Sequence, residues 1–189
     1  MIILPCPIRP DLDCVAGSVA YAEYLERTQG KEARAWICGK PDGEAQFYLD
    51  LFSEQVALAN DAAAAQAQSY ILVDFSTKIC LPDSVDTKKV AEVIDHRFFN
   101  APDVDFPNAR IQLDPVGAAA TQIAEFYHAA GIAPSPHSAA MLYGAIYSNT
   151  LCFDKEYAVE RDLKAAEWLL EVEPSSNAYI EKQLQVRKE

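Results

Sequence analysis

Four carboxylates, one imidazole and one guanidinium follow three short apolar runs of this 189-residue sequence. They are Asp11 and Asp13 after the first run, Asp74 after a later one, and Asp95, His96 and Arg97 after a third. Clustered carboxylates repel one another, so one of them must hold a proton unless a cation lies between them. Aspartate oxygens with one imidazole nitrogen suit Mn²⁺, Mg²⁺ or Fe²⁺ better than metals that prefer thiolates. The residue types therefore predict a divalent-metal site.

A metal at these groups would make a hydroxide nucleophile available near neutral pH and would draw charge from a phosphoryl oxygen. Arg97 follows His96 directly and has the planar fork that binds phosphate oxygens. We therefore predict metal-assisted hydrolysis of a small phosphorylated substrate, with Asp74, His96 and Arg97 as catalytic residues.

The elements that must position these groups alternate along the chain. Short continuous apolar runs, typical of strands buried on both faces, cover residues 2–6, 33–38, 70–73 and 90–94, with a further strand expected at 109–113. Helical spacing is present between them at residues 15–27 and 44–52, and the alanines of 61–67 suit a short helix. This order predicts a doubly wound, mostly parallel five-stranded α/β sheet with helices on both faces. Ligands of such sheets bind at the carboxyl ends of the strands, where the polar groups lie.

The last third of the chain has a helical pattern. Helices are expected at 116–130, 135–148, 158–170 and 175–187, with glycine and prolines between them. They form a C-terminal helical cover over the sheet. The last of them packs on the body, pairs with a second subunit or begins a linker, and the sequence alone leaves these three open.

Simpler roles exist for some of these residues. Asp11 and Asp13 have the position of helix-capping aspartates before the first helix. His128 and His137 have no acidic partner near in sequence, so surface or packing roles are expected. Five cysteines without a Cys-x-x-Cys pair indicate free thiols rather than a disulfide framework or a zinc ribbon.

Composition excludes several classes of protein. Half of the residues are hydrophobic and 23% are charged, which is typical of a globular protein and not of a disordered or collagen-like chain. A formal charge of −12 opposes binding to nucleic acid in bulk and to anionic membranes. No apolar run is long enough for a membrane span, and no basic segment precedes the apolar N-terminus, so we expect a cytoplasmic protein.

Five segments, in order, resemble the motifs of the DHH phosphoesterases, the superfamily of manganese-dependent (family II) inorganic pyrophosphatases, exopolyphosphatases and prune proteins. They are Pro10-Asp11-Leu12-Asp13-Cys14, Val73-Asp74, Ile94-Asp95-His96-Arg97, Val116 to Thr121, and Ala145 to Phe153. The resemblance spans residues 5 to about 165 and implies a parallel sheet domain that holds two metals. It places Asp11, Asp13, Asp74 and His96 at metal-ligand positions, with Asp74 as the bridging ligand. Arg97 stands at the second histidine of the signature, and prune proteins are similar in having Asp-His-Arg there.

The sequence departs from the family pattern at three points. Pro7 stands where the family has a ligand histidine, and Asn149 stands where it has an aspartate. The chain is also too short for the family's second domain, so we expect residues 1–172 to form a DHH-type α/β domain and residues 173–189 a C-terminal helix that serves as linker or dimerisation element. With two ligands altered, one or two Mn²⁺ or Mg²⁺ ions are expected, and Asn149 is expected to contact metal or substrate.

Three functions are compatible with these features. The first is a DHH-type hydrolase of a phosphoanhydride or phosphoester, and the second is a non-catalytic module that binds metal, phosphate or nucleotide. A receiver-like signalling domain is disfavoured because no lysine follows a later strand. A homodimer is a further expectation, since a second subunit would close the open edge of the sheet against water.

Overall fold

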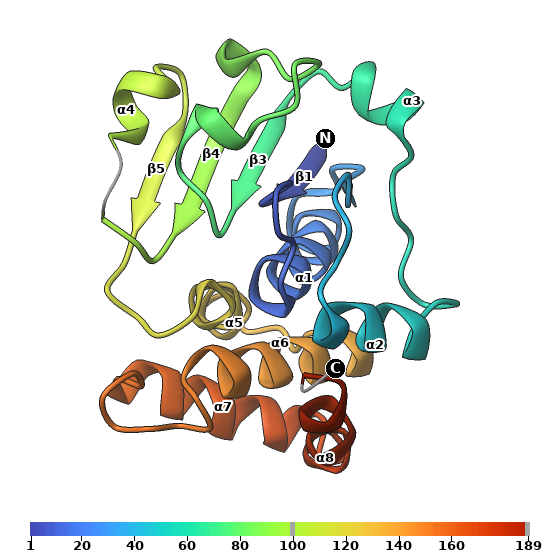
Figure 1. The fold of residues 1–189 in the computed structure, drawn as a ribbon, viewed down its shortest axis with the longest axis vertical. Helices are drawn as coiled ribbons and strands as arrows, with labels where there is room; N and C mark the ends of the chain where they lie inside the picture. The colour runs from blue at the N-terminus through green and yellow to red at the C-terminus, as the bar shows by residue number, and fades with distance from the viewer. Residues whose placement is uncertain (99–100, 188–189) are drawn as a thin grey trace.

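The computed structural model describes residues 1–98 and 101–187, and its centre is a five-stranded parallel sheet in the order β2-β1-β3-β4-β5 (Figure 1). The strands are β1 (Ile2–Pro5), β2 (Arg34–Ala35), β3 (Tyr70–Val73), β4 (Val90–Asp95) and β5 (Arg110–Leu113). Every paired neighbour runs parallel. The predicted α/β fold is confirmed. β2 is shorter than expected, because this edge strand pairs only with the first residues of β1.

Eight α-helices surround the sheet in the described part of the chain. They are α1 (Leu12–Gln29), α2 (Gly43–Leu51), α3 (Asp61–Ala65), α4 (Pro102–Asp105), α5 (Ala119–Ala129), α6 (Pro136–Asn149), α7 (Glu160–Val172) and α8 (Ser176–Val186). Two short 3₁₀ turns, η1 (Lys78–Cys80) and η2 (Thr87–Lys89), join β3 to β4. The sequence did not predict α4 or these turns, because three or four residues are too few to show helical periodicity.

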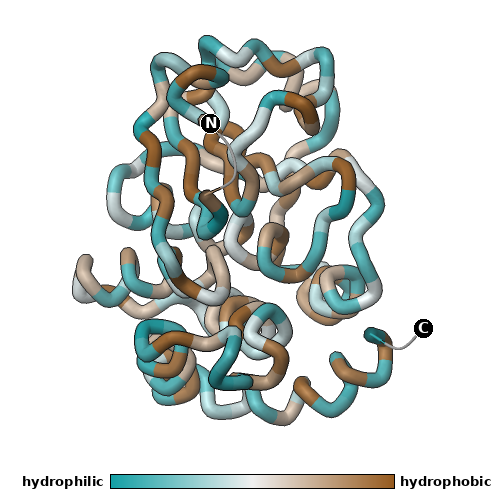
Figure 2. The backbone as a smooth tube through the Cα atoms, turned by 60° about the vertical axis from the view of Figure 1, so that its left-hand side comes forward, coloured by the Kyte–Doolittle hydropathy of each residue, from teal (hydrophilic) through white to brown (hydrophobic). Residues whose placement is uncertain are grey.

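The two faces of the sheet are covered differently. Alternate strand residues such as Ile3, Ile71 and Val73 pack with α1, α5 and α6 in the larger core. The opposite set, which includes Leu4 and Leu72, packs under α3 and the loops around the 3₁₀ turns. Hydrophobic and hydrophilic stretches alternate along the backbone (Figure 2). One face therefore has long helices and the other has short elements, so the sheet has helices on both faces as predicted.

The carboxyl ends of β3, β4 and β5 point toward the part of the molecule that holds α5, α6 and α7 (Figure 1). The strand order reverses between β1 and β3, because β2 lies on one side of β1 and all later strands lie on the other. Loops diverge at such a reversal and leave a crevice. The fold therefore brings the β1–α1 and β3–η1 loops under the helical cover.

The last helix packs on the body of the molecule. Gln183 of α8 is buried, accepts a hydrogen bond from the Tyr48 hydroxyl (2.9 Å) and donates to the Gly144 carbonyl (3.0 Å) and to Glu44 (3.2 Å). Ile180 is buried beside it. α8 thus joins α2 and α6 through a buried polar network.

Residues 188 and 189 of the expected C-terminal segment lie outside the described residues. No helix that the structure describes is long and apolar enough to cross a membrane.

Gly144→Ala is expected to loosen this network. A Cβ at this position would lie 2.4 Å from the Tyr48 hydroxyl and 2.7 Å from Gln183 Oε1, so either the side chains or α8 must move. Overpacking of this kind costs about 1–3 kcal/mol of unfolding free energy. Urea unfolding of the variant and the wild type measures the loss, and equal stability would show that α8 is not held as the structure describes.

Candidate metal centre

Loops from opposite halves of the chain line a pocket of about 420 Å³ at the strand reversal. Its lining includes Asp11 from the β1–α1 loop, Asp74 after β3, His96 and Arg97 after β4, and Asn149 at the end of α6. Five of the six residues that the sequence selected as ligands, catalysts or substrate contacts therefore face one cavity. The sixth, Asp13, lies buried directly beside it.

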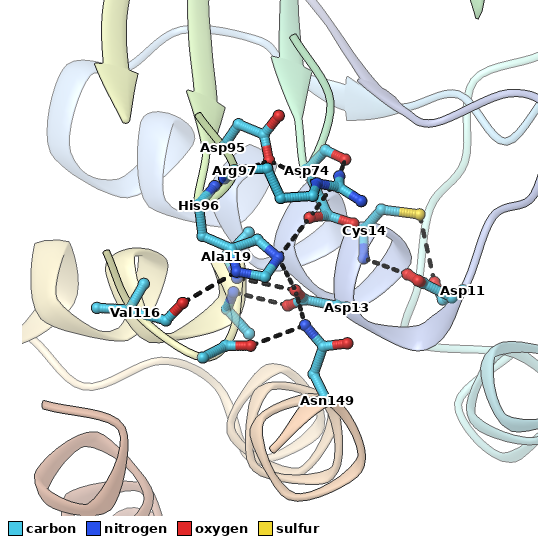
Figure 3. A network of polar contacts seen from close by, with 12 residues as sticks. Asp11, Asp13, Cys14, Asp74, Asp95, His96, Arg97, Val116, Ala119 and Asn149 are labelled. Carbon is cyan, nitrogen blue, oxygen red and sulfur yellow. Dashed lines mark hydrogen bonds and ion pairs between the residues drawn. The ribbon is translucent and has the colours of Figure 1, made fainter. Parts of the chain in front are cut away.

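Two groups of potential ligand atoms share Asp74. A carboxylate oxygen of Asp13, one of Asp74 and a ring nitrogen of His96 all lie within 4.8 Å of one another, and so do a carboxylate oxygen of Asp11, one of Asp74 and Cys14 Sγ. His96 Nε2 is 3.3 Å from Asp74 Oδ1 and 3.9 Å from Asp13 Oδ2 (Figure 3). Asp74 is the carboxylate that could contact an ion in either group.

The orientation of His96 shows that a cation fits the first group. Its Nδ1 is 2.9 Å from the carbonyl oxygen of Val116, which can only accept, so Nδ1 carries a hydrogen. In the neutral ring, Nε2 then presents a lone pair to two carboxylates. That arrangement needs either a second proton on the ring or a metal ion between the three groups. A metal-binding histidine usually donates a hydrogen bond from its other ring nitrogen in this way.

Asp13 has a structural role as well as a place in this group. Its carboxylate accepts hydrogen bonds from the backbone N–H groups of Ala119 and Ala120, at 2.8 Å each. The N-cap residue of α5, Ala118, has no side-chain bond of its own, so Asp13 caps α5 from across the fold. Burial, and next the charge of Asp74, hold the pKa of Asp13 well above its ordinary value. A capping role for this residue is correct, but the helix is α5 and not α1.

Asp11 is the cap of α1. Its side chain accepts from the Cys14 backbone N–H at 3.1 Å, which makes α1 begin at Leu12, three residues before the expected start. The same carboxylate lies within reach of Asp74. The capping alternative therefore holds for Asp11, and capping does not remove it from the pocket.

Asp74 is held in an uncommon backbone conformation. Its φ is +62°, in the left-handed region that non-glycine residues seldom occupy, and its N–H donates to the Ile94 carbonyl at 2.8 Å. Burial raises the pKa of Asp74 to about 6, against the lowering effect of the His96 hydrogen bond and of Arg97. Strain of this kind concentrates at functional sites.

Arg97 lies across Asp74 instead of extending freely. One terminal nitrogen contacts both the carbonyl and the carboxylate of Asp74, the latter at 2.9 Å, and Nε is 3.1 Å from Asp95 Oδ1. Asp95 also accepts from the Ser76 hydroxyl at 2.7 Å. Asp95, the last residue of β4, therefore belongs to neither metal group, and it orients Arg97.

Asn149 contacts the centre through its amide nitrogen. Nδ2 donates to Asp13 Oδ2 at 3.0 Å and to the Gly117 carbonyl at 2.9 Å. Both partners are acceptors, so the amide can donate a hydrogen bond to each of them. An aspartate at this position would repel Asp13 unless a cation were present. The nitrogen cannot act as a metal ligand while it donates these bonds.

Three contributors escaped prediction as functional residues. They are the carbonyl of Val116, the backbone of Gly117, and Asp162 in the first turn of α7, which accepts from the Gly117 N–H. Backbone groups carry no side-chain signal, and Asp162 resembles an ordinary acidic residue at a helix start.

The remaining candidates behave as the simpler interpretation predicts. His128 packs against the Trp168 ring at 5.2 Å, and His137 lies 6.1 Å from the Phe52 ring. All five cysteines are unpaired.

Without metal, the protein is expected to lose stability as the pH rises from 6.5 through 9. Burial lowers the pKa of His96, but its contacts with Asp74 and Asp13 outweigh burial and raise the pKa from 6.5 to about 9. The charged ring therefore stabilises the fold fully below pH 6.5, and this contribution disappears as the pH passes about 9. Urea unfolding in a chelator at several pH values measures the slope. His96→Gln should flatten it, and an unchanged slope would contradict the assignment.

Comparison with known proteins finds similar proteins for most of this chain. No family model matches the chain. Over 164 residues it is 31% identical to a probable manganese-dependent inorganic pyrophosphatase from an Exiguobacterium species, covering 86% of this chain and 52% of that protein. A protein of the same description from Bacillus cytotoxicus is 31% identical over 163 residues, with the same coverage.

Solved structures share the fold. A candidate family II inorganic pyrophosphatase from Methanococcus jannaschii superposes with a TM-score of 0.71 at 24% identity, over 98% of this chain and 61% of that one. An exopolyphosphatase-related protein from Bacteroides fragilis gives 0.70 at 15% identity, over 98% and 55%. The chain spans about half the length of the curated relatives it matches. It is thus similar to manganese-dependent inorganic pyrophosphatases over about half of their length.

Proposed function

We propose that this protein is a metal-dependent phosphohydrolase of the DHH type that cleaves a small phosphoanhydride, such as pyrophosphate or a short polyphosphate. The observation that carries the proposal is the convergence of Asp13, Asp74 and His96, with the lone-pair side of the imidazole facing two carboxylates. Similarity to manganese-dependent pyrophosphatases over 86% of the chain supports the same chemistry.

The residues of the pocket have distinct tasks in this proposal. Asp13, Asp74 and His96 hold Mn²⁺ or Mg²⁺, and Asp11 with Asp74 supplies a second position. A bound ion would acidify a water molecule and neutralise charge on the phosphoryl oxygens. Arg97, from the Asp-His-Arg variant of the signature, keeps Asp74 in place and presents positive charge at the pocket, where a phosphate group would bind.

The first group is the stronger of the two metal positions. The second holds two carboxylates and a buried thiol, Cys14, whose pKa burial and the surrounding carboxylates raise. Pro7 offers no ligand atom to it, and a protonated thiol is a weak ligand. We therefore infer one tightly held ion at Asp13, Asp74 and His96, and a second, weaker position beside Asp11.

A non-catalytic binding module is the second candidate, and two contacts favour it. Arg97 is already engaged by Asp74 and Asp95, and Asn149 donates a hydrogen bond to Asp13 where the family pattern has a charged ligand. Both features stabilise the pocket in the absence of metal. Such a module would bind Mn²⁺ together with phosphate or a nucleotide and release no product.

Release of inorganic phosphate distinguishes the two candidates. Pyrophosphate, short polyphosphate and an aryl phosphate are each incubated with the protein and Mn²⁺, and Asp74→Asn serves as the variant without the shared ligand. Turnover that requires both Mn²⁺ and Asp74 supports the hydrolase. Mn²⁺ binding without turnover of any of the three substrates would establish the binding module instead.

The organisation of the chain and its assembly are also proposals. Residues 1–172 form the DHH-type α/β domain, and residues 173–189 add a helix whose described part packs on α2 and α6. We propose a homodimer that closes the open side of the pocket and a cytoplasmic location. Light scattering of the purified protein tests the dimer, and a monomer at all accessible concentrations would refute it.

A further inference from the structure

A single peptide group links the metal centre to α7. The carbonyl of Val116 is 2.9 Å from His96 Nδ1, and the N–H of the same peptide unit, on Gly117, is 3.0 and 2.9 Å from the two carboxylate oxygens of Asp162. Asp162, the Val116–Gly117 peptide group and His96 are therefore joined by a continuous line of hydrogen bonds. It joins residues that lie far apart in the sequence.

The Asp162 side chain is fixed within this line. It is fully buried and also accepts hydrogen bonds from the Thr121 hydroxyl (2.6 Å) and the Val159 N–H (2.8 Å). Among residues 1–98 and 101–187, no lysine, arginine or histidine forms an ion pair with it. A buried carboxylate held by neutral donors alone retains a strong field toward them, because the low dielectric of the interior does not screen it.

Gly117 is required for this approach. A Cβ at that position would lie 2.8 Å from Asp162 Oδ2 and 2.6 Å from the methyl group of Thr150. Any larger residue would therefore push the carboxylate away from the peptide N–H. Its φ is not positive, so close contact and not backbone freedom explains the glycine.

We propose that Asp162 is a positioning residue for His96, acting through the Val116–Gly117 peptide. This inference deepens the proposed metal-dependent function and rests on it for its catalytic meaning. The carboxylate polarises the peptide, which makes the Val116 carbonyl a stronger acceptor and fixes the imidazole with Nε2 toward Asp13 and Asp74. Histidine ligands often donate directly to a carboxylate, whereas here one peptide group stands between them.

Nuclear magnetic resonance of the imidazole protons in metal-free protein tests the line itself. The chain has only three histidines, so His96→Gln identifies the His96 signal. In wild type we expect a downfield Nδ1 proton that exchanges slowly with water. Asp162→Asn should move it upfield and speed its exchange, because the amide offers one acceptor where the carboxylate offers two.

Thr121→Ala provides the matched control. It removes a different hydrogen bond to the same carboxylate and leaves the Gly117 contact, so it costs stability without changing the His96 proton. Should Asp162→Asn fail to fold, the line is tested from its other end in His96→Leu, whose side chain has no donor. Loss of the imidazole donor should then move the Gly117 amide proton upfield, toward a weaker bond with Asp162. A purely structural Asp162 would leave that signal in place.

Mn²⁺ affinity, measured by titration calorimetry, is the second readout. Loss of an outer contact of a metal-binding histidine typically weakens binding by about 10–100-fold, and we expect this range for Asp162→Asn and no comparable change for Thr121→Ala. If the wild type binds no Mn²⁺, the proposed function fails, while the imidazole and amide signals still decide on the line. Unmoved His96 and Gly117 signals, or equal effects in Asp162→Asn and Thr121→Ala, would overturn the inference.

Discussion

Asp74→Asn is expected to remove Mn²⁺-dependent phosphate release while leaving the protein folded. Asp74 is the only carboxylate that belongs to both recorded groups of ligand atoms among the described residues, so its loss affects either ion. Asparagine tolerates the left-handed backbone at this position, with φ of +62°, better than most residues do. Loss of a shared charged ligand should reduce kcat/KM by more than about a hundredfold.

The stability of the same variant separates a catalytic loss from misfolding. Asp74 is fully buried, and burial raises its pKa despite its contacts with His96 and Arg97, so a neutral amide avoids a desolvation cost that offsets the loss of those contacts in the metal-free protein. We expect an unchanged or higher melting temperature in chelator and the loss of any rise on adding Mn²⁺. Asp83→Asn, at an exposed carboxylate, is the control. Full activity in Asp74→Asn would exclude the proposed centre.

Asn149→Asp is expected to make the fold depend on metal. The new carboxylate oxygen would stand about where Nδ2 lies now, 3.0 Å from Asp13 Oδ2 and 2.9 Å from the Gly117 carbonyl. Two hydrogen bonds become two repulsive contacts in a partly buried setting, which should lower the free energy of unfolding by about 3 kcal/mol in the absence of metal. A dication between the carboxylates reverses the sign of this interaction.

Melting temperatures with chelator and with increasing Mn²⁺ measure this effect. Because an ion that binds only the folded state stabilises it in proportion to RT ln(1 + [Mn²⁺]/Kd), the variant should respond more steeply than the wild type. Asn149→Ala is the matched control, since it removes the amide and adds no charge. Equal metal dependence in all three proteins would show that position 149 does not face the ion.

The strand ends were predictable because their signals are local. Continuous apolar runs fixed the positions of β1, β3 and β4, and parallel pairing placed Asp11, Asp74 and His96 on one edge. The helices of the C-terminal third were equally visible from their periodicity. The strand pattern could not show in which direction each carboxylate points. Asp95 lies at a strand end like the other carboxylates, but it contacts Arg97 and Ser76 and not the metal groups.

The unpredicted part of the centre consists of contacts between distant segments. Asp13 caps a helix that begins 106 residues later, and Asp162 reaches a peptide 45 residues earlier. Such contacts depend on how α5, α6 and α7 pack against the sheet, and no spacing rule in a single sequence encodes that packing. Asn149 was recognisable as an altered position, but only the structure shows that its nitrogen, not its oxygen, meets Asp13.

Asp13 is oriented by its hydrogen bonds to α5, so the pocket forms only when α5 packs against the first part of the chain. The βα unit at the start of the chain supplies the carboxylate, and the first turn of α5 supplies the N–H groups that orient it. Cutting the polypeptide between β5 and α5 would therefore leave all the candidate metal ligands on the first fragment, without the backbone N–H groups that orient Asp13. The mixed fragments should bind a divalent cation only after they have associated.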